Sequence, residues 1–150
     1  MIPLAKRASP AAIAALRQAT AARPKRKRAS DGLLPSKAHV KQNPNSDHNS
    51  GLAVDITHDP KKGIDCAFAF IKLQQDKRVK YLIFNGKIWS AERGTRDYTG
   101  SNPHKTHLHI SIKDACGYDT SPWFPWLPKA KVINKVKAVA KSLPKKKEAK

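Results

Sequence analysis

The stretch VKYLIFNGKIWSA, residues 79–91, decides how this chain folds. Two runs rich in β-branched and aromatic residues flank the dipeptide Asn85-Gly86. Asn-Gly readily adopts the two positive φ angles of a type I′ turn, so the pattern predicts a β-hairpin. The two strands of a hairpin pair antiparallel, so we expect antiparallel strands in this protein.

Two further segments alternate strictly between apolar and polar residues, as half-buried strands do. GLAVDI (51–56) and HLHISI (107–112) each place their branched apolar side chains on one face. The opposite face of the first segment carries Asp55, and that of the second carries His107 and His109. Each predicted strand thus has one side for a core and one side that offers chemically active groups.

Two helices are expected beside these strands. Residues 10–22 are rich in alanine and predict a helix that ends before Pro24. Residues 64–76 predict a second helix with an apolar side. The residues expected on that buried side are Ile64, Phe68 and Ile71.

The remaining segments of the central region are expected to lack regular structure. Residues 29–50 and 91–105 are polar and rich in turn-forming residues, so they predict loops. The basic run PKRKR (24–28) is expected to be solvated. SPWFPWLP (121–128) contains three prolines, which exclude a regular helix or a central strand, and we expect it to wrap the core.

The charge of the chain is concentrated at its two ends. The 150 residues include 30 Lys and Arg against 11 Asp and Glu, a formal net charge of +19. Residues 1–28 hold eight basic and no acidic residues, and residues 129–150 hold nine Lys and one Glu. Residues 29–128 are nearly balanced, which argues against a compact nucleic-acid-binding domain.

This distribution suggests three parts: a basic N-terminal helix and loop (1–28), a central domain (29–128) and a Lys-rich tail (129–150). The tail spaces apolar residues at helical intervals opposite its lysines, which predicts a cationic amphipathic helix. Two such flanks would attract anionic envelope polymers or an anionic membrane surface.

Neither membrane insertion nor secretion is expected from the sequence. No apolar run approaches 18 residues, and the N-terminus does not predict a secretory signal. The two cysteines, Cys66 and Cys116, form no CxxC motif, so we expect reduced thiols and no thiolate zinc site. We expect a monomer that is made in the cytoplasm.

The predicted polar faces contain the groups of a metal site. His48 precedes Asp55 by seven residues, and His107 and His109 lie about 6.6–6.8 Å apart along one strand face. That separation is too large for both to chelate one ion symmetrically, so one would bind the metal and the other would act beside it. Two imidazoles, one carboxylate and one open position are the composition of a catalytic zinc site, although ligand type alone leaves copper or iron open.

The same residues resemble those of a known family. Ser46-Asp47-His48-Asn49-Ser50-Gly51-Leu52-Ala53-Val54-Asp55 resembles the SxHxxGxAxD motif of the zinc D-alanyl-D-alanine carboxypeptidases and the related L-alanyl-D-glutamate endopeptidases of phage endolysins. His107-Leu108-His109 resembles their HxH motif, which lysostaphin-type peptidases and the hedgehog signalling domain share. The resemblance covers roughly residues 29–113.

The resemblance implies the roles of these residues. His48, Asp55 and His109 would bind Zn²⁺, and His107 would act beside the metal without binding it. It implies an α+β fold of the hedgehog/DD-peptidase type around a small antiparallel sheet, with the metal in a groove on one face. The implied reaction is hydrolysis of a peptide bond in bacterial peptidoglycan, by a phage lysin that reaches the cell wall through a holin or from the virion.

One position departs from the family pattern and leaves the general base open. Many members place a glutamate three residues before the third ligand, where this chain has Thr106. His107 is the first candidate for the base or oxyanion partner, and His104 is the second. Glu92 or Asp59 would serve only if folding brought either one to the site.

Two other functions are compatible with the same sequence. Without the glutamate, the domain could be a catalytically silent, metal-containing module that binds the cell wall. PKRKR and the Lys-rich tail would instead suit a basic nucleic-acid-binding protein, although the balanced central region argues against it. The sequence does not distinguish an endopeptidase from a carboxypeptidase.

Overall fold

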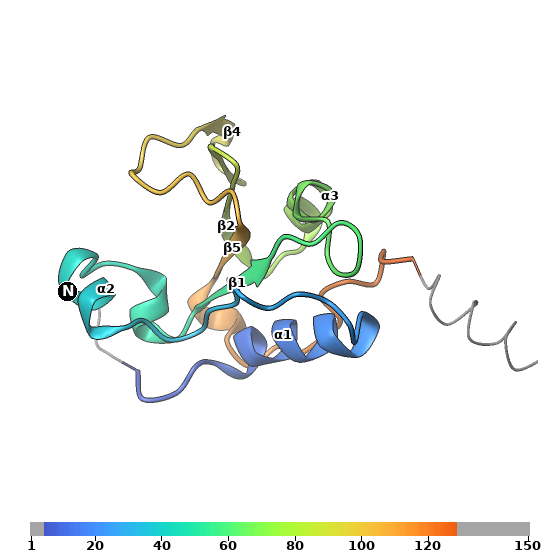
Figure 1. Cartoon of the computed structure of the whole chain (residues 1–150). Helices are drawn as coiled ribbons and strands as arrows, with labels where there is room; N and C mark the ends of the chain where they lie inside the picture. Colours follow the sequence, from blue (N-terminus) through green and yellow to red (C-terminus); the bar gives the residue numbers. More distant parts are fainter. Residues whose placement is uncertain (1–4, 129–150) are drawn as a thin grey trace, which may run out of the picture.

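The computed structural model describes residues 5–128, and its centre is an antiparallel sheet (Figure 1). The sheet has the strand order β1-β5-β2-β3-β4. Its strands are β1 (Ala53–Thr57), β2 (Val79–Phe84), β3 (Lys87–Ser90), β4 (Gly94–Asp97) and β5 (His107–Ile112). With the helices described next, this sheet confirms the predicted α+β class. The amphipathic helix predicted for the tail lies outside the described residues.

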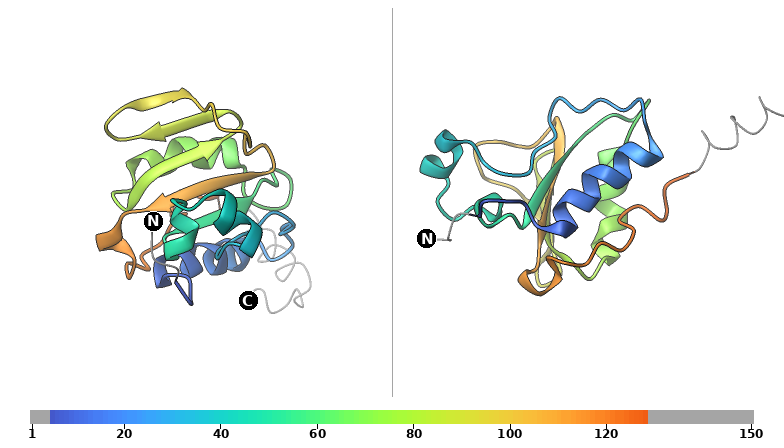
Figure 2. Two further views of the ribbon diagram at one scale, coloured as in Figure 1. Left: turned by 90° about the vertical axis from the view of Figure 1, so that its left-hand side faces the viewer. Right: turned by 90° about the horizontal axis from the view of Figure 1, so that it is seen from below.

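Helices lie on both sides of the sheet (Figure 2). The α-helices within residues 5–128 are α1 (Pro10–Ala22), α2 (Lys37–Gln42) and α3 (Cys66–Lys72). Short 3₁₀ segments are η1 (Asp47–Ser50), η2 (Leu73–Gln75) and η3 (Asp114–Cys116). α3 packs against β2 and β5, and α1 packs beside β1, whereas α2 lies on the other side of the sheet. None of the helices in the described part is long and apolar enough to cross a membrane.

The predicted hairpin and the two alternating strands are confirmed. Asn85 and Gly86 have φ angles of 49° and 79°, as the two central residues of a type I′ turn require. β1 and β5 pair antiparallel, with Asp55 opposite His109. The apolar sides of both strands are buried in one core.

The helix predicted for residues 10–22 is confirmed and belongs to that core. Its buried residues are Ala11, Ala12, Ala15 and Ala19, whose small side chains let the helix approach the sheet closely. Trp123 is fully buried and its indole N–H donates to the carbonyl oxygen of Ala11 at 2.9 Å. The core therefore extends across the predicted division between residues 28 and 29.

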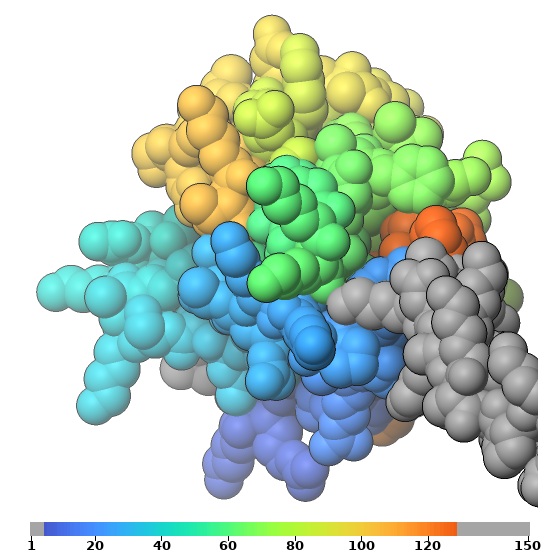
Figure 3. Space-filling model, turned by 45° about the vertical axis from the view of Figure 1, so that its right-hand side comes forward, coloured from blue at the N-terminus to red at the C-terminus, as the bar shows by residue number. Residues whose placement is uncertain are grey.

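The segment 121–128 packs against the core, as expected. Arg78 stacks its guanidinium 3.6 Å from the ring centroid of Trp123, and the ring of Trp126 lies 5.4 Å from that of Phe68. Figure 3 shows the end of this segment at the surface between the α1 and α3 regions. Aromatic side chains thus anchor a stretch in which proline prevents regular structure.

The predicted buried side of the second helix is wrong in part. The helix begins only at Cys66, because the Asp65 carboxylate caps it by accepting from the N–H groups of Ala67 and Phe68. Phe68 is 42% and Ile71 is 63% exposed, whereas Cys66, Ala69 and Phe70 are buried. Apolar residues occupy most positions of this helix, so the spacing did not determine which side meets the sheet.

Two predicted loops contain regular elements. β4 lies within 91–105 and pairs with β3 through its backbone, which requires no apolar alternation. α2 and η1 lie within 29–50, where the Ser36 and Ser46 hydroxyls cap their first turns. Local capping and pairing therefore order segments whose composition indicated only loops.

The basic run is not wholly solvated. Arg26 is 5% exposed, and its guanidinium donates two hydrogen bonds to the Asp31 carboxylate, at 2.6 and 3.1 Å. Asp31 also accepts from the backbone N–H and hydroxyl of Thr57 on β1. Arg26 and Asp31 therefore tie the N-terminal loop to the strand that carries Asp55.

Asp59 makes a second link between this loop and the central region. Its carboxylate accepts from the backbone N–H of Lys27 at 2.8 Å and from that of Lys62 at 3.2 Å. The hydrogen bond from Lys27 lowers the pKa of Asp59 below its ordinary value. Asp59 is thus a structural residue, and it does not line the pocket described below.

Asp59→Asn should lower the free energy of unfolding at pH 7 by about 1–2 kcal/mol, because a charged acceptor of two N–H groups becomes neutral. Folding depresses the pKa of Asp59, so its stabilisation is present above about pH 4 and is lost at lower pH. In urea unfolding, the difference between wild type and variant should therefore shrink between about pH 5 and about pH 2. A constant difference would show that the charge is not the cause.

Candidate metal centre

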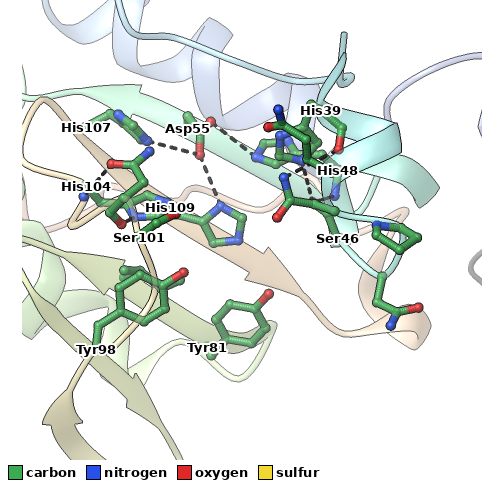
Figure 4. A pocket seen from close by; sticks show the side chains of 16 residues that line it. His39, Ser46, His48, Asp55, Tyr81, Tyr98, Ser101, His104, His107 and His109 are labelled. Carbon is green, nitrogen blue, oxygen red and sulfur yellow. Dashed lines mark hydrogen bonds and ion pairs between the residues drawn. The ribbon is translucent and has the colours of Figure 1, made fainter. Parts of the chain in front are cut away.

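Three neighbouring elements place the predicted metal ligands on one face of the sheet (Figure 4). Asp55 on β1 and His109 on β5 are direct cross-strand partners. His48 comes from η1, which is followed by Gly51, with a φ of 76°, before the chain enters β1. A Cβ at Gly51 would lie 2.8 Å from the carbonyl oxygen of Arg7, so glycine suits this turn both in conformation and in space.

His48, Asp55 and His109 form a group that could hold a metal ion. Their candidate ligand atoms all lie within 4.8 Å of one another. His48 Nε2 lies 3.2 Å from Asp55 Oδ2, and His109 Nδ1 lies 3.1 Å from Asp55 Oδ1. The structure therefore brings together the three residues that the sequence indicated as ligands.

In both histidines, the ring nitrogen that does not face Asp55 already has a hydrogen-bond partner, which fits a metal site. His48 Nδ1 donates to the carbonyl oxygen of Leu33 at 2.7 Å, which leaves Nε2 facing Asp55. His109 Nε2 lies 2.7 Å from the Ser111 hydroxyl, which leaves Nδ1 facing Asp55. Histidine ligands of metals are commonly held by such a bond on the nitrogen that does not bind the metal.

Asp55 and His48 stabilise each other's charges. Burial opposes ionisation of Asp55, but the adjacent imidazoles of His109 and His48 outweigh it and hold the pKa of Asp55 well below the usual range. Burial also opposes protonation of His48, yet the hydrogen bond to Asp55 outweighs it and raises the pKa of His48. The site thus maintains an ionised carboxylate, the form that binds metals.

His107 and His104 lie beside this group, as Figure 4 shows. His107 Nε2 is 4.0 Å from Asp55 Oδ1, and its Nδ1 is 3.0 Å from the Thr106 hydroxyl. The ring of His104 lies 4.8 Å from that of His107. Burial lowers the pKa of His107 and lowers that of His104 to about 4, so both rings are kept neutral.

His104 has an unusual backbone conformation. Its φ angle is 57°, a region that non-glycine residues rarely adopt. Its Nδ1 lies 2.6 Å from the carbonyl oxygen of Asn102, and its own carbonyl oxygen accepts from the N–H of Asn85. The hairpin turn therefore holds the loop that presents His104 to the site.

An open pocket of about 650 Å³ lies over the metal group. Besides the five predicted site residues, it is lined by His39, Tyr81 and Tyr98, which the sequence analysis did not select. His39 lies on a helix within a predicted loop, so nothing placed it near His48. Tyr81 lies on the predicted hairpin, but the face to which it points depends on an irregularity in β2 described below.

The alternative acidic bases are not at this site. Within the described residues, Asp55 is the acidic side chain that lines the pocket, and Glu92 and Asp59 lie outside it. Trp89, Trp123 and Trp126 are also outside the pocket and pack on the core. Of the candidates for the base, the structure therefore brings only His107 and His104 to the metal group.

Fold and site together define an α+β domain with a histidine–aspartate group suited to a metal ion. A family model described as the C-terminal domain of VldE matches residues 5–109, which include this whole group. The chain belongs to that family. Comparison with curated proteins found no match, and comparison with solved structures found none either.

The site should bind one zinc ion per chain. Replacing His48, Asp55 or His109 by alanine should weaken zinc binding by more than about 100-fold, since losing a partner of a ligand already costs 10–100-fold. His104→Ala should bind zinc as the wild type does, because His104 is outside the ligand group. Calorimetric titration and metal analysis measure both. Equal losses in all four variants would contradict the assignment.

Proposed function

We propose that this protein is a zinc-dependent peptidase that hydrolyses a peptide bond in the stem peptide or cross-link of bacterial peptidoglycan. The observation that carries the proposal is the His48–Asp55–His109 group at an open pocket, with His107 directly beside it. The resemblance to the zinc carboxypeptidases and phage endopeptidases supplies the substrate class.

The donor set favours zinc among the common metals. Two imidazole nitrogens and one carboxylate suit zinc, whereas calcium and magnesium prefer sites made mostly of oxygen ligands. When bound, zinc would supply a Lewis acid that polarises a peptide carbonyl and makes water more acidic. His48, Asp55 and His109 would hold it through Nε2, a carboxylate oxygen and Nδ1.

His107 is the preferred proton acceptor. Its Nδ1 lies 3.0 Å from the Thr106 hydroxyl, and when Nδ1–H donates to that oxygen the lone pair of Nε2 faces the metal group. Thr106 stands where the glutamate base occurs in many members of the resembled family. A threonine that orients the neighbouring histidine offers a physical explanation for that replacement. His104 remains the second candidate, because its ring contacts both His107 and His109.

The pocket chemistry suits a peptide substrate. Apart from the histidines and Asp55, its polar lining consists of uncharged amide and hydroxyl groups from Asn, Gln, Ser and Tyr side chains. Such groups donate to and accept from peptide bonds, and the volume of about 650 Å³ leaves room for several residues.

The proposed setting follows from the charge of the chain. The basic residues concentrated in 1–28 and 129–150 would raise its concentration near anionic envelope polymers or an anionic membrane surface. We propose that it is a monomeric phage lysin, made in the host cytoplasm and delivered to the cell wall through a holin or carried on the virion.

A second candidate function is a metal-containing module that binds the cell wall without cleaving it. The observation in its favour is that no carboxylate besides Asp55 lines the pocket within residues 5–128. A site of this kind would bind zinc and peptidoglycan, but it would lack an effective base.

Purified peptidoglycan sacculi distinguish these functions. The zinc-loaded protein should release fragments with new peptide ends, identified by mass spectrometry, and a chelator should abolish the release until zinc is restored. The identity of the new ends names the bond that is cut. Sacculi that bind the zinc-loaded protein but stay intact would support the silent module instead.

His107→Gln should reduce turnover by about 100-fold or more, the usual contribution of a general base, while zinc binding persists. Thr106→Val should reduce it less, since the imidazole remains but loses its orienting hydroxyl. Initial rates on a soluble fragment from the sacculi assay measure both. If His104→Gln lost turnover and His107→Gln kept it, the roles of the two histidines would be exchanged.

A further inference from the structure

A chain of polar side chains leads from the metal group into the sheet. His109 Nε2 lies 2.7 Å from the hydroxyl of Ser111, and His109 and Ser111 are 5% and 0% exposed. Tyr81 lies opposite Ser111 on β2, and its ring stacks on the His109 imidazole with centroids 5.5 Å apart. Two hydroxyl-bearing residues therefore contact His109: Ser111 at Nε2 and Tyr81 on the face of the ring.

An irregularity in β2 brings Tyr81 to this position. Val79 pairs with Ile112, but Tyr81 pairs with Ser111, so Lys80 is an extra residue in the ladder. Without such a β-bulge, Val79 and Tyr81 would face the same side. With it, Val79 points into the core and Tyr81 lines the pocket. Lys80 places its ammonium 3.2 Å from both carboxylate oxygens of Asp47.

Tyr81 connects Ser111 with Asp47. Its phenol hydrogen-bonds with both side chains, and a phenol carries its proton at neutral pH. Asp47 is the residue before His48. It is buried and forms an ion pair with Lys80. Hydrogen bonds therefore link Asp47, Tyr81, Ser111 and His109 in this order, and we call these four residues the Asp47–His109 chain. Lys80 pairs with its Asp47 end.

The carboxylate end sets the direction of every hydrogen bond in this chain. A carboxylate only accepts, so the Tyr81 hydroxyl must donate to Asp47. The Tyr81 oxygen then accepts from the Ser111 hydroxyl, and the Ser111 oxygen accepts from His109 Nε2–H. His109 Nε2 therefore carries a proton, and Nδ1 is the nitrogen available to a metal.

We propose that Ser111 and Tyr81 are positioning residues that fix His109 as an Nδ1 metal ligand through the Asp47–His109 chain. The proposal rests on the metal centre of the proposed function, but it requires no turnover. In this proposal, Lys80 at the β-bulge holds the Asp47 carboxylate, the final acceptor of the chain, in place through their ion pair.

Zinc affinity of the full-length protein tests the proposal. Ser111→Ala should weaken zinc binding by about 10–100-fold, the usual effect of removing a partner of a metal-binding histidine. Ser111→Thr keeps the hydroxyl and should restore most of the affinity. Tyr81→Phe keeps the stacked ring but loses the link to Asp47, and it should show a smaller loss than Ser111→Ala.

Thr57→Val is the matched control. Thr57 is also a buried residue of the sheet with a hydroxyl group. Its hydroxyl hydrogen-bonds with Asp31 and Ser30 and not with a metal-binding histidine. This variant should lose stability and keep its zinc affinity. If Ser111→Ala bound zinc as the wild type does, or if Thr57→Val lost as much affinity as Ser111→Ala, the proposal would be overturned.

Nitrogen-15 NMR of histidine rings in the zinc-loaded protein gives an independent readout. The wild type should show a slowly exchanging Nε2–H for His109, and Ser111→Ala should lose its protection from exchange. A His109 protonated at Nδ1 in the wild type would contradict the proposal. If the sacculi stay intact while the zinc affinities and the NMR signal are as expected, the peptidase function is rejected and the role of Ser111 and Tyr81 is supported.

Discussion

The half-buried carboxylate of Asp55 is the group that organises the site. A charge removed from water is costly unless it is paired, and here two imidazoles flank it at 3.1 and 3.2 Å. Those imidazoles are in turn held by a backbone carbonyl and a serine hydroxyl. The geometry that a metal requires is therefore already favoured by the electrostatics of the protein alone.

The pairing of β1 with β5 makes this arrangement possible. Side chains alternate between faces, so a shift of one residue in either strand would turn Asp55 or His109 toward the core. The apolar faces of both strands are fully buried and hold the register that sets Asp55 opposite His109. Packing on one face of the sheet thus maintains the chemistry on the other.

Ion pairs outside the site secure the segments that frame it. Arg26 and Asp31 attach the N-terminal loop to β1, and Arg78 binds the carbonyl oxygens that precede Trp123. Lys80 and Asp47 join β2 to the segment that carries His48. Of these cations, Arg26 lies in the run that the sequence predicted to be solvated, and its structural role became visible only with its partner Asp31.

The hairpin at Asn85-Gly86 and the alternating strands could be predicted from the sequence, because turn conformation and side-chain alternation are local properties. The choice of His48, Asp55 and His109 as ligand candidates came from the resemblance of their motifs to a known family. Other features became visible only in the folded chain: Phe68 and Ile71 stay exposed, β4 forms, His39 and Tyr81 line the pocket, and Asp59 and Glu92 do not. These outcomes depend on contacts between segments distant in sequence, and on a β-bulge at Lys80 that reverses the local alternation. Local periodicity carries no information about such contacts.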